Sequence, residues 1–129
     1  MLHPGHLKYL EQCKEHGDIL VVCVSGDVRT KRRKGATRPV MPANQRAKLV
    51  AGLKPVDFVF VSDLRPFSEP TLRAIAPNLV VTSSNEPSTA LKRQFFEYMR
   101  RNHPAIRVTF ITRPRNGWSS SKLIKKLKT

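Results

Sequence analysis

A chain of 129 residues is long enough for one domain of ordinary size and too short for two. Hydrophobic residues make up 40% of it, and the lack of any apolar run of about 18 residues predicts a soluble protein and excludes a membrane-spanning helix. The N-terminus lacks the basic segment and the apolar segment of a secretory signal, so we expect a cytoplasmic protein. The 24 Lys and Arg residues outnumber the 9 Asp and Glu residues, and the net charge of +15 attracts polyanions, whether nucleic acid, acidic lipid or phosphorylated small molecules.

The first segment of the chain contains one predicted helix and one predicted strand. Apolar residues recur at helical spacing between His6 and Glu15. The apolar run 19–24 is rich in β-branched residues, which is typical of a parallel strand buried on both faces. Cys13 and Cys23 fall in these two elements without metal-ligand spacing, so we expect both to be small buried residues in a reduced compartment.

A basic segment and a second helix follow. Residues 28–42 show no periodicity, carry many basic side chains and include Gly35 and two prolines, so they are predicted to form a long exposed loop. Such loops usually carry function. Apolar positions at helical spacing predict a helix over 43–53, opened by Pro42.

The rest of the chain alternates between strands and helices. Strands are expected over 56–63, 78–84 and 106–112, with helices over 68–75, 88–102 and 119–127. Strands that alternate with helices at short spacing indicate an α/β fold, with a parallel sheet covered by helices on both faces. Because no repeat or long linker divides the chain, we expect a single domain over 1–129.

Two histidines stand close together in His3-Pro4-Gly5-His6, directly before the first predicted helix. Ligands of open parallel sheets bind at the carboxyl ends of the strands, where helix N-termini present N–H groups to anions. Residues three apart at a helix start can share a face, and Gly5 lets a ligand approach the backbone. The imidazoles could therefore donate hydrogen bonds to phosphate oxygens. A pair of solvated surface histidines is the alternative, which the glycine and the helix disfavour.

Two further stretches would fall on the same edge of the sheet. One is the basic segment that includes Lys34, with Arg46 on the next helix; its plainer interpretation is a solubilising run or a nucleic-acid arm. The other comprises Ser119, Ser120 and Ser121, whose hydroxyls and backbone N–H groups at a helix start suit phosphate, with simple helix capping as the alternative. Three such stretches on one edge predict a phosphate-binding site.

Motifs of one enzyme family occur along nearly the whole chain, in the expected order. The core of the cytidylyltransferase-like nucleotidyltransferases, with its His-x-Gly-His signature, resembles LHPGHLKYLEQCKEHGDILVVCVSGD. The heptose-1-phosphate adenylyltransferases and, more loosely, glycerol-3-phosphate cytidylyltransferase are similar to KGATRPVMPANQRAKLVAGLKPVDFVF. The family's closing Ser/Thr-rich motif resembles GWSSSKLI. The resemblance implies a Rossmann-like fold and, as often in this family, a homodimer.

The resemblance also implies a reaction. A phosphorylated sugar or polyol attacks the α-phosphorus of ATP or CTP and pyrophosphate leaves, normally with Mg²⁺ bound to the triphosphate and with no dedicated set of metal-ligating residues. The catalytic residues implied are His3 and His6, which would contact the reacting phosphates, and Lys34, which would stabilise the phosphoryl charge. Nucleotide and phosphate binding is implied for Gly5, Arg46, Arg113, Ser119, Ser120 and Ser121.

The sequence departs from the family pattern in two places. It lacks the strand and the Gly-x-Phe-Asp turn that precede the His motif, so we expect a chain that is N-terminally truncated, with Met1 at an internal position of the pattern. That strand lies in the middle of the sheet, and its loss would leave backbone groups unpaired or bring its neighbours together. Residues 80–96 differ from the heptose enzymes' Gly-Gly-Asp-Tyr-like segment, so the sequence does not identify the acceptor.

Two alternatives to an active nucleotidyltransferase stay open. The net charge and the basic last helix favour a nucleic-acid-binding module, although few aromatic residues and no zinc-finger pattern disfavour nucleic acid as a partner. The missing strand and Asp favour a catalytically impaired remnant of the family, which would bind nucleotide without turnover.

Overall fold

A computed structural model describes residues 2–35, 37, 41–65, 67–83 and 89–112. These residues form two compact units, the first ending at Ser68 and the second beginning at Glu69. The expected single domain stays a prediction, and the expected helix over 119–127 lies outside the described residues. Within the described ranges, no helix has both the length and the apolar character needed to cross a bilayer.

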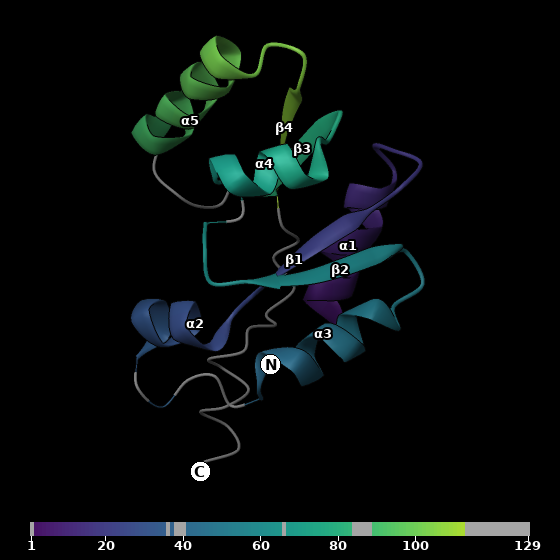
Figure 1. Ribbon diagram of the computed structural model, residues 1–129. Coiled ribbons are helices and arrows are strands. Elements are labelled where there is room, and N and C mark those ends of the chain that lie inside the picture. Colours follow the sequence, from purple (N-terminus) through teal and green to yellow (C-terminus); the bar gives the residue numbers. More distant parts are fainter. Residues whose placement is uncertain (1, 36, 38–40, 66, 84–88, 113–129) are drawn as a thin grey trace. The chain divides into compact units, whose positions relative to one another are not determined.

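The first unit contains three helices and two parallel strands among its described residues (Figure 1). In chain order these are α1 (Pro4–Lys14), β1 (Val21–Ser25), α2 (Asp27–Lys34), α3 (Ala43–Ala51) and β2 (Phe58–Ser62). The register pairs Val21 with Phe58 at one end and Ser25 with Ser62 at the other. Because the strands run in the same direction, the turns that leave β1 and β2 lie at the same edge of the sheet.

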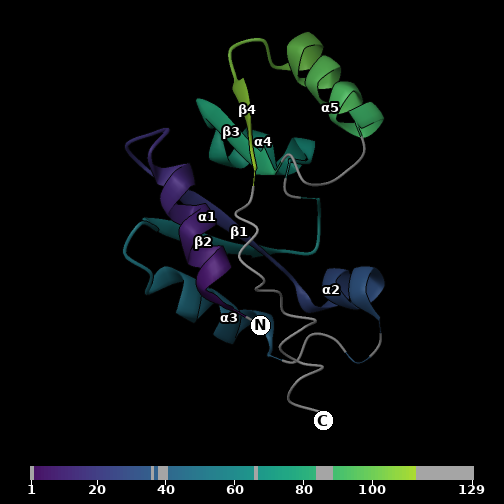
Figure 2. The ribbon, with the colours of Figure 1, turned by 180° about the vertical axis from the view of Figure 1, so that it is seen from behind.

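The core of this unit is a cluster of Leu10 from α1, Val24 from β1, Val50 from α3 and Val56 from the turn before β2. All four side chains are buried, and partly buried hydrophobic residues from the same elements pack against them. Seen from behind, α1 lies in front of β1 and β2 (Figure 2). Burial of apolar surface between the helices and the strands therefore holds this unit together.

The second unit contains α4 (Glu69–Ile75), β3 (Leu79–Ser83), α5 (Thr89–Asn102) and β4 (Arg107–Ile111). The strands β3 and β4 pair in parallel, with Leu79 opposite Arg107. Met99 is 1% exposed, and Leu72 and Val80 are each 3% exposed, so α4, β3 and α5 each contribute to the buried interior.

The predicted α/β alternation with parallel strands is confirmed, but the expected single sheet is not found among the described residues. The four strands form two two-stranded sheets, in which β1 pairs with β2 and β3 pairs with β4. The apolar runs predicted the four strands because β-branched residues favour strands. The expected burial on both faces is wrong for the first of them, because Val24 is the only buried residue of β1, and Phe58 of the neighbouring β2 is 62% exposed. The same runs contain no information on which strand lies beside which.

The expected loop over 28–42 is wrong for its first half, because residues 27–34 form α2. Arg and Lys are good helix formers, and their charges in the last turn complement the helix dipole. Val28 is 52% exposed and Thr30 is buried, so the helix has no apolar stripe that periodicity could detect. It ends at Gly35, whose φ of 101° favours glycine.

Candidate active site

The two histidines of the His-x-Gly-His stretch lie at the start of α1 and hold each other in place. His3 is the N-cap residue, and its Nδ1 accepts a hydrogen bond from the backbone N–H of Gly5 at 3.1 Å. The backbone N–H of His3 donates to Nδ1 of His6 at 3.2 Å, which completes a reciprocal capping box. The two rings are stacked with centroids 3.8 Å apart. The predicted juxtaposition of these histidines is therefore confirmed.

This capping box selects one tautomer of each ring. A ring nitrogen that accepts a hydrogen bond from a backbone N–H has no proton of its own, so a neutral His3 and a neutral His6 each carry their proton on Nε2. Pro4, at the first helical position, needs no hydrogen-bond partner for its nitrogen. The helix start thus presents two stacked imidazoles whose Nε2–H groups are hydrogen-bond donors.

The basic helix α2 begins at the carboxyl end of β1, and hydrogen bonds of the Asp63 and Thr30 side chains hold its start in place. Its N-cap, Gly26, makes no side-chain hydrogen bond, but the carboxylate of Asp63 accepts from the backbone N–H of Arg29 at 3.0 Å. The hydroxyl of Thr30 donates to the carbonyl of Gly26 at 2.9 Å. Lys34, the last residue of α2, is exposed. The basic residues of this segment thus lie on a helix whose start is fixed by hydrogen bonds.

The next helix, α3, is capped by a residue of α2. Oδ1 of Asp27 accepts from the backbone N–H of Ala43 at 2.9 Å and from Nη2 of Arg46 at 3.1 Å. Nε of Arg46 donates to the carbonyl of Met41 at 2.9 Å. Arg46, a candidate phosphate ligand, therefore already neutralises a carboxylate and fixes the segment that leads into its own helix.

A hollow of about 610 Å³ opens where β1 and β2 end and α2 and α3 begin. It is lined by Gly26, Asp27, Val28, Ala43, Asn44, Val61 and Asp63. This is the strand edge at which parallel sheets bind ligands. Sequence reasoning missed Asp27 and Asp63, although a signal existed: β1 and β2 each end in a Ser that is followed within two residues by an Asp.

The predicted site residues fall into separate groups. His3, Gly5 and His6 come together at the start of α1. The cationic α2 and Arg46 of α3 are joined through Asp27, as described above. The remaining candidates, Arg113, Ser119, Ser120 and Ser121, lie outside the described residues.

Cysteine chemistry does not belong to this site. Burial raises the pKa of the Cys23 thiol, and the nearby Arg29 charge offsets the shift only in part. Cys23 therefore stays a neutral thiol at physiological pH, and a thiol is a weak nucleophile compared with a thiolate. The other cysteine, Cys13, is buried in α1 as predicted, whereas the same prediction is wrong for Cys23, which is only half-buried.

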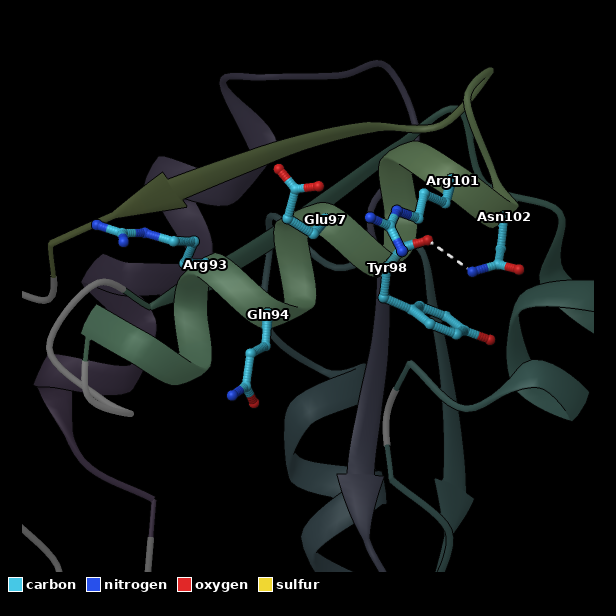
Figure 3. A pocket seen from close by; sticks show the side chains of 6 residues that line it. All are labelled: Arg93, Gln94, Glu97, Tyr98, Arg101 and Asn102. Atoms are coloured by element: carbon cyan, nitrogen blue, oxygen red, sulfur yellow. Dashed lines mark hydrogen bonds between the residues drawn. The ribbon is translucent and has the colours of Figure 1, made fainter.

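The second unit has a hollow of its own, on the surface of α5. Figure 3 shows the side chains that line it: Arg93, Gln94, Glu97, Tyr98, Arg101 and Asn102. All six come from one helix, and the amide of Asn102 donates to the carbonyl of Tyr98 at 2.9 Å. A hollow built from one helix brings no groups from different elements toward a common point, so we place no catalysis there.

Glu69 joins the start of α4 to the end of α5. Its Oε1 accepts a hydrogen bond from the Tyr98 hydroxyl and lies 2.7 Å from Nε2 of His103, and Arg73 is 3.7 Å from its other oxygen. Hydrogen bonds from Tyr98 and His103 lower the pKa of the Glu69 carboxyl. The same bond from Tyr98 to Glu69 raises the pKa of the Tyr98 hydroxyl. This group therefore links two helices of the second unit.

Comparisons with known proteins agree with the motifs. The bifunctional protein HldE of Alkalilimnicola ehrlichii is 39% identical over 95 residues, which is 70% of this chain and 19% of that protein. FAD synthase of Methanosphaerula palustris is 40% identical over 86 residues, which is 67% of this chain and 54% of that protein. The chain therefore spans about a fifth of the length of this HldE protein and about half of the length of this FAD synthase.

A solved structure matches the fold of this chain. The crystal structure of the lipopolysaccharide core biosynthesis protein from Thermoplasma volcanium GSS1 matches with a TM-score of 0.71 at 25% identity, over 88% of this chain and 89% of that chain. A family model described as cytidylyltransferase-like matches residues 1–126. With its His-x-Gly-His capping box, its Rossmann-like α/β fold and a family match over nearly its whole length, the chain belongs to the cytidylyltransferase-like family.

Proposed function

We propose that this protein is a nucleotidyltransferase that transfers a nucleotidyl group from ATP or CTP to a phosphorylated sugar or polyol. An oxygen of the acceptor phosphate forms a bond to the α-phosphorus of the triphosphate. The bond from the α-phosphorus to the oxygen that bridges to the β-phosphorus breaks, and pyrophosphate leaves with that oxygen. Family membership supports the reaction class, and the capping box at the start of α1 is the observation that carries the assignment of its centre.

The histidine pair suits the charge that develops in this reaction. With Nδ1 of each ring accepting from the backbone, the Nε2–H groups of His3 and His6 donate to phosphate oxygens. Donors that are already oriented by their own hydrogen bonds stabilise developing negative charge without reorganising during the reaction. The ammonium of Lys34 adds a positive charge for the same phosphates, and the backbone at Gly5 admits their close approach.

In the proposed reaction, Mg²⁺ binds together with the triphosphate. Among residues 2–112, in the ranges that the structure describes, no three His, Cys, Asp or Glu side chains gather as a metal site. Mg²⁺ keeps several waters and is usually bound by substrate phosphates with one or two carboxylates. Asp27, which lines the hollow at the strand edge, is a carboxylate suited to such a role. When bound, the ion would polarise the phosphoryl oxygens and neutralise their charge.

Pyrophosphate release tests this proposal. The purified protein is incubated with Mg²⁺, ATP or CTP, and a panel of sugar and polyol phosphates, and we expect release with at least one pair. His3→Ala should lower the rate on the order of a hundredfold or more, because a preorganised donor to the developing charge is lost. His16→Ala, at an exposed histidine after α1, is the matched control and should leave the rate unchanged. A folded protein that binds triphosphate but releases no pyrophosphate with any acceptor would instead be a non-catalytic member of the family.

A second candidate function is the binding of nucleic acid. The last turn of α2 carries Lys31, Arg32, Arg33 and Lys34, all exposed, in a chain of net charge +15. Such a surface binds DNA without sequence preference, and its affinity falls steeply with salt concentration. Titration with duplex and single-stranded DNA at two salt concentrations tests it. Tight triphosphate binding together with weak DNA binding would favour the nucleotidyltransferase.

A further inference from the structure

The carboxylate of Asp63 fills a capping role that Gly26, the N-cap residue of α2, cannot fill. Gly26 stands at the N-cap position, where it has no side chain to offer. Asp63, the residue directly after β2, accepts from the backbone N–H of Arg29, in the first turn of α2, at 3.0 Å. A negative charge thus lies at the positive end of the helix dipole and satisfies an N–H group that has no partner within the helix.

This arrangement is possible because residue 26 is glycine. A Cβ atom at position 26 would lie 2.2 Å from Oδ1 and 2.9 Å from Oδ2 of Asp63, far inside the roughly 3.5 Å at which non-bonded atoms attract. The backbone N–H of Gly26 also donates to the carbonyl of Ser62 at 2.9 Å, which holds the turn against the end of β2. The carboxylate of Asp63 therefore fits against the turn only because residue 26 has no side chain.

The position of α2 depends strongly on these polar contacts. Val28 is 52% exposed, so this apolar side chain of α2 contributes little packing. The guanidinium of Arg29 donates to the carbonyl of Leu64 at 3.1 Å, next to the capping carboxylate. Both hydrogen bonds join the first turn of α2 to the residues that follow β2. Together with the pairing of Asp27 with Arg46, they therefore set the direction in which the helix leaves the sheet and where its last residue, Lys34, is placed.

We propose that Asp63 is a positioning residue for nucleotidyl transfer, which acts by capping α2 and so holding Lys34 at the reacting phosphates. The inference rests on the proposed function and on the role of Lys34 in it. Without the cap, the start of α2 shifts and the ammonium of Lys34 is displaced from the developing charge. Since Lys34 acts in the transition state, kcat falls and KM for the triphosphate changes little.

A double-mutant cycle tests this. We expect Asp63→Ala to lower kcat for pyrophosphate release on the order of tenfold, and Asp63→Asn, which keeps an oxygen for the Arg29 N–H, to restore most of it. In a Lys34→Ala background, Asp63→Ala should have no further effect on kcat, because the residue it positions is gone. Asp18→Ala, an exposed carboxylate removed elsewhere in the unit, controls for the change in net charge.

A second variant keeps the test decisive if Asp63→Ala fails to fold. Gly26→Ala displaces the carboxylate without removing it, so it should lower kcat alone and have little further effect in a Lys34→Ala background. The positioning role would be overturned, while the reaction stands, if Asp63→Ala lowered kcat equally with and without Lys34. The same holds if Asp63→Asn were as slow as Asp63→Ala. No release by the unsubstituted protein would show, before any substitution, that the proposed function has failed.

Discussion

Arg46 and Asp27 form an ion pair that joins the starts of two helices, with Nη2 of Arg46 3.1 Å from Oδ1 of Asp27. The Arg46 side chain is 18% exposed and the Asp27 side chain is 46% exposed, so solvent screens the pair only in part. Oδ1 of Asp27 also caps α3 through the N–H of Ala43. One oxygen atom therefore fixes α2 relative to α3.

Loss of this pair should destabilise the first unit. We expect Arg46→Ala to lower the free energy of unfolding by about 1 to 2 kcal/mol, since hydrogen bonds to charged groups contribute on that scale. Arg46→Lys should also be destabilising, because an ammonium cannot reach both Asp27 and the Met41 carbonyl as the guanidinium does. Urea unfolding measures both, with Lys48→Ala, an exposed cation on the same helix, as the control. If Arg46→Ala and Lys48→Ala behaved alike, the ion pair would contribute nothing to stability.

The capping role of His3 can be separated from the role in phosphate binding that we propose for it. His3→Ala should lower the free energy of unfolding by about 1 kcal/mol, because the N–H of Gly5 loses its acceptor. His3→Asn keeps an oxygen acceptor at the N-cap and should have nearly wild-type stability. Both variants lose the imidazole, so pyrophosphate release should fall equally in the two. Retention of activity in His3→Asn would show that the imidazole serves only as a cap.

Asp57 should make stability depend on acid pH. A hydrogen bond from Lys14, and a further one from the backbone N–H of Leu20 at 2.8 Å, hold the pKa of this carboxyl below its ordinary value. Because the pKa is lower in the folded state than in the unfolded state, the stabilisation is complete above about pH 4 and is lost as the pH falls through the folded pKa. Urea midpoints of the wild type and Asp57→Asn should therefore differ at neutral pH and converge in acid. A difference that is independent of pH would contradict this sign.

Tyr98 should titrate late in alkali. The hydrogen bond to the Glu69 carboxylate raises the pKa of the phenol above that of a free tyrosine. The ultraviolet difference spectrum between the wild type and Tyr98→Phe isolates this side chain, because the chain contains two tyrosines. Glu69→Gln should bring the midpoint back toward about 10, the ordinary value. If the titration midpoint of Tyr98 were the same in the wild type and in Glu69→Gln, the hydrogen bond would be absent in solution.

The parts of the site that the sequence predicted depend on neighbours in the chain. His3 and His6 are three residues apart at a helix start, so local helix geometry alone brings their rings together. The strands could be predicted for a similar reason, because each is a short run of β-branched residues. Such features need no knowledge of the rest of the fold.

The parts that the sequence did not predict depend on contacts between distant segments. The helix α2 lacks an apolar periodicity, and the carboxylate that caps it comes from Asp63, 34 residues beyond its bonding partner Arg29. Arg46 was a candidate phosphate ligand because a cation on a helix near a basic segment suggests an anion site. Its pairing with Asp27, 19 residues earlier, is set by the way the two helices leave the strands. Periodicity and motif spacing do not report such pairs.

The close approach of Gly26 to Asp63 limits how this protein can change during evolution. Any side chain at position 26 collides with the carboxylate, so that substitution becomes acceptable only after position 63 has become smaller or the turn has opened. A carboxylate at position 63, in turn, can cap α2 only while residue 26 is glycine. Among natural variants, the two positions should therefore be inherited and replaced together, although 36 residues separate them in the chain.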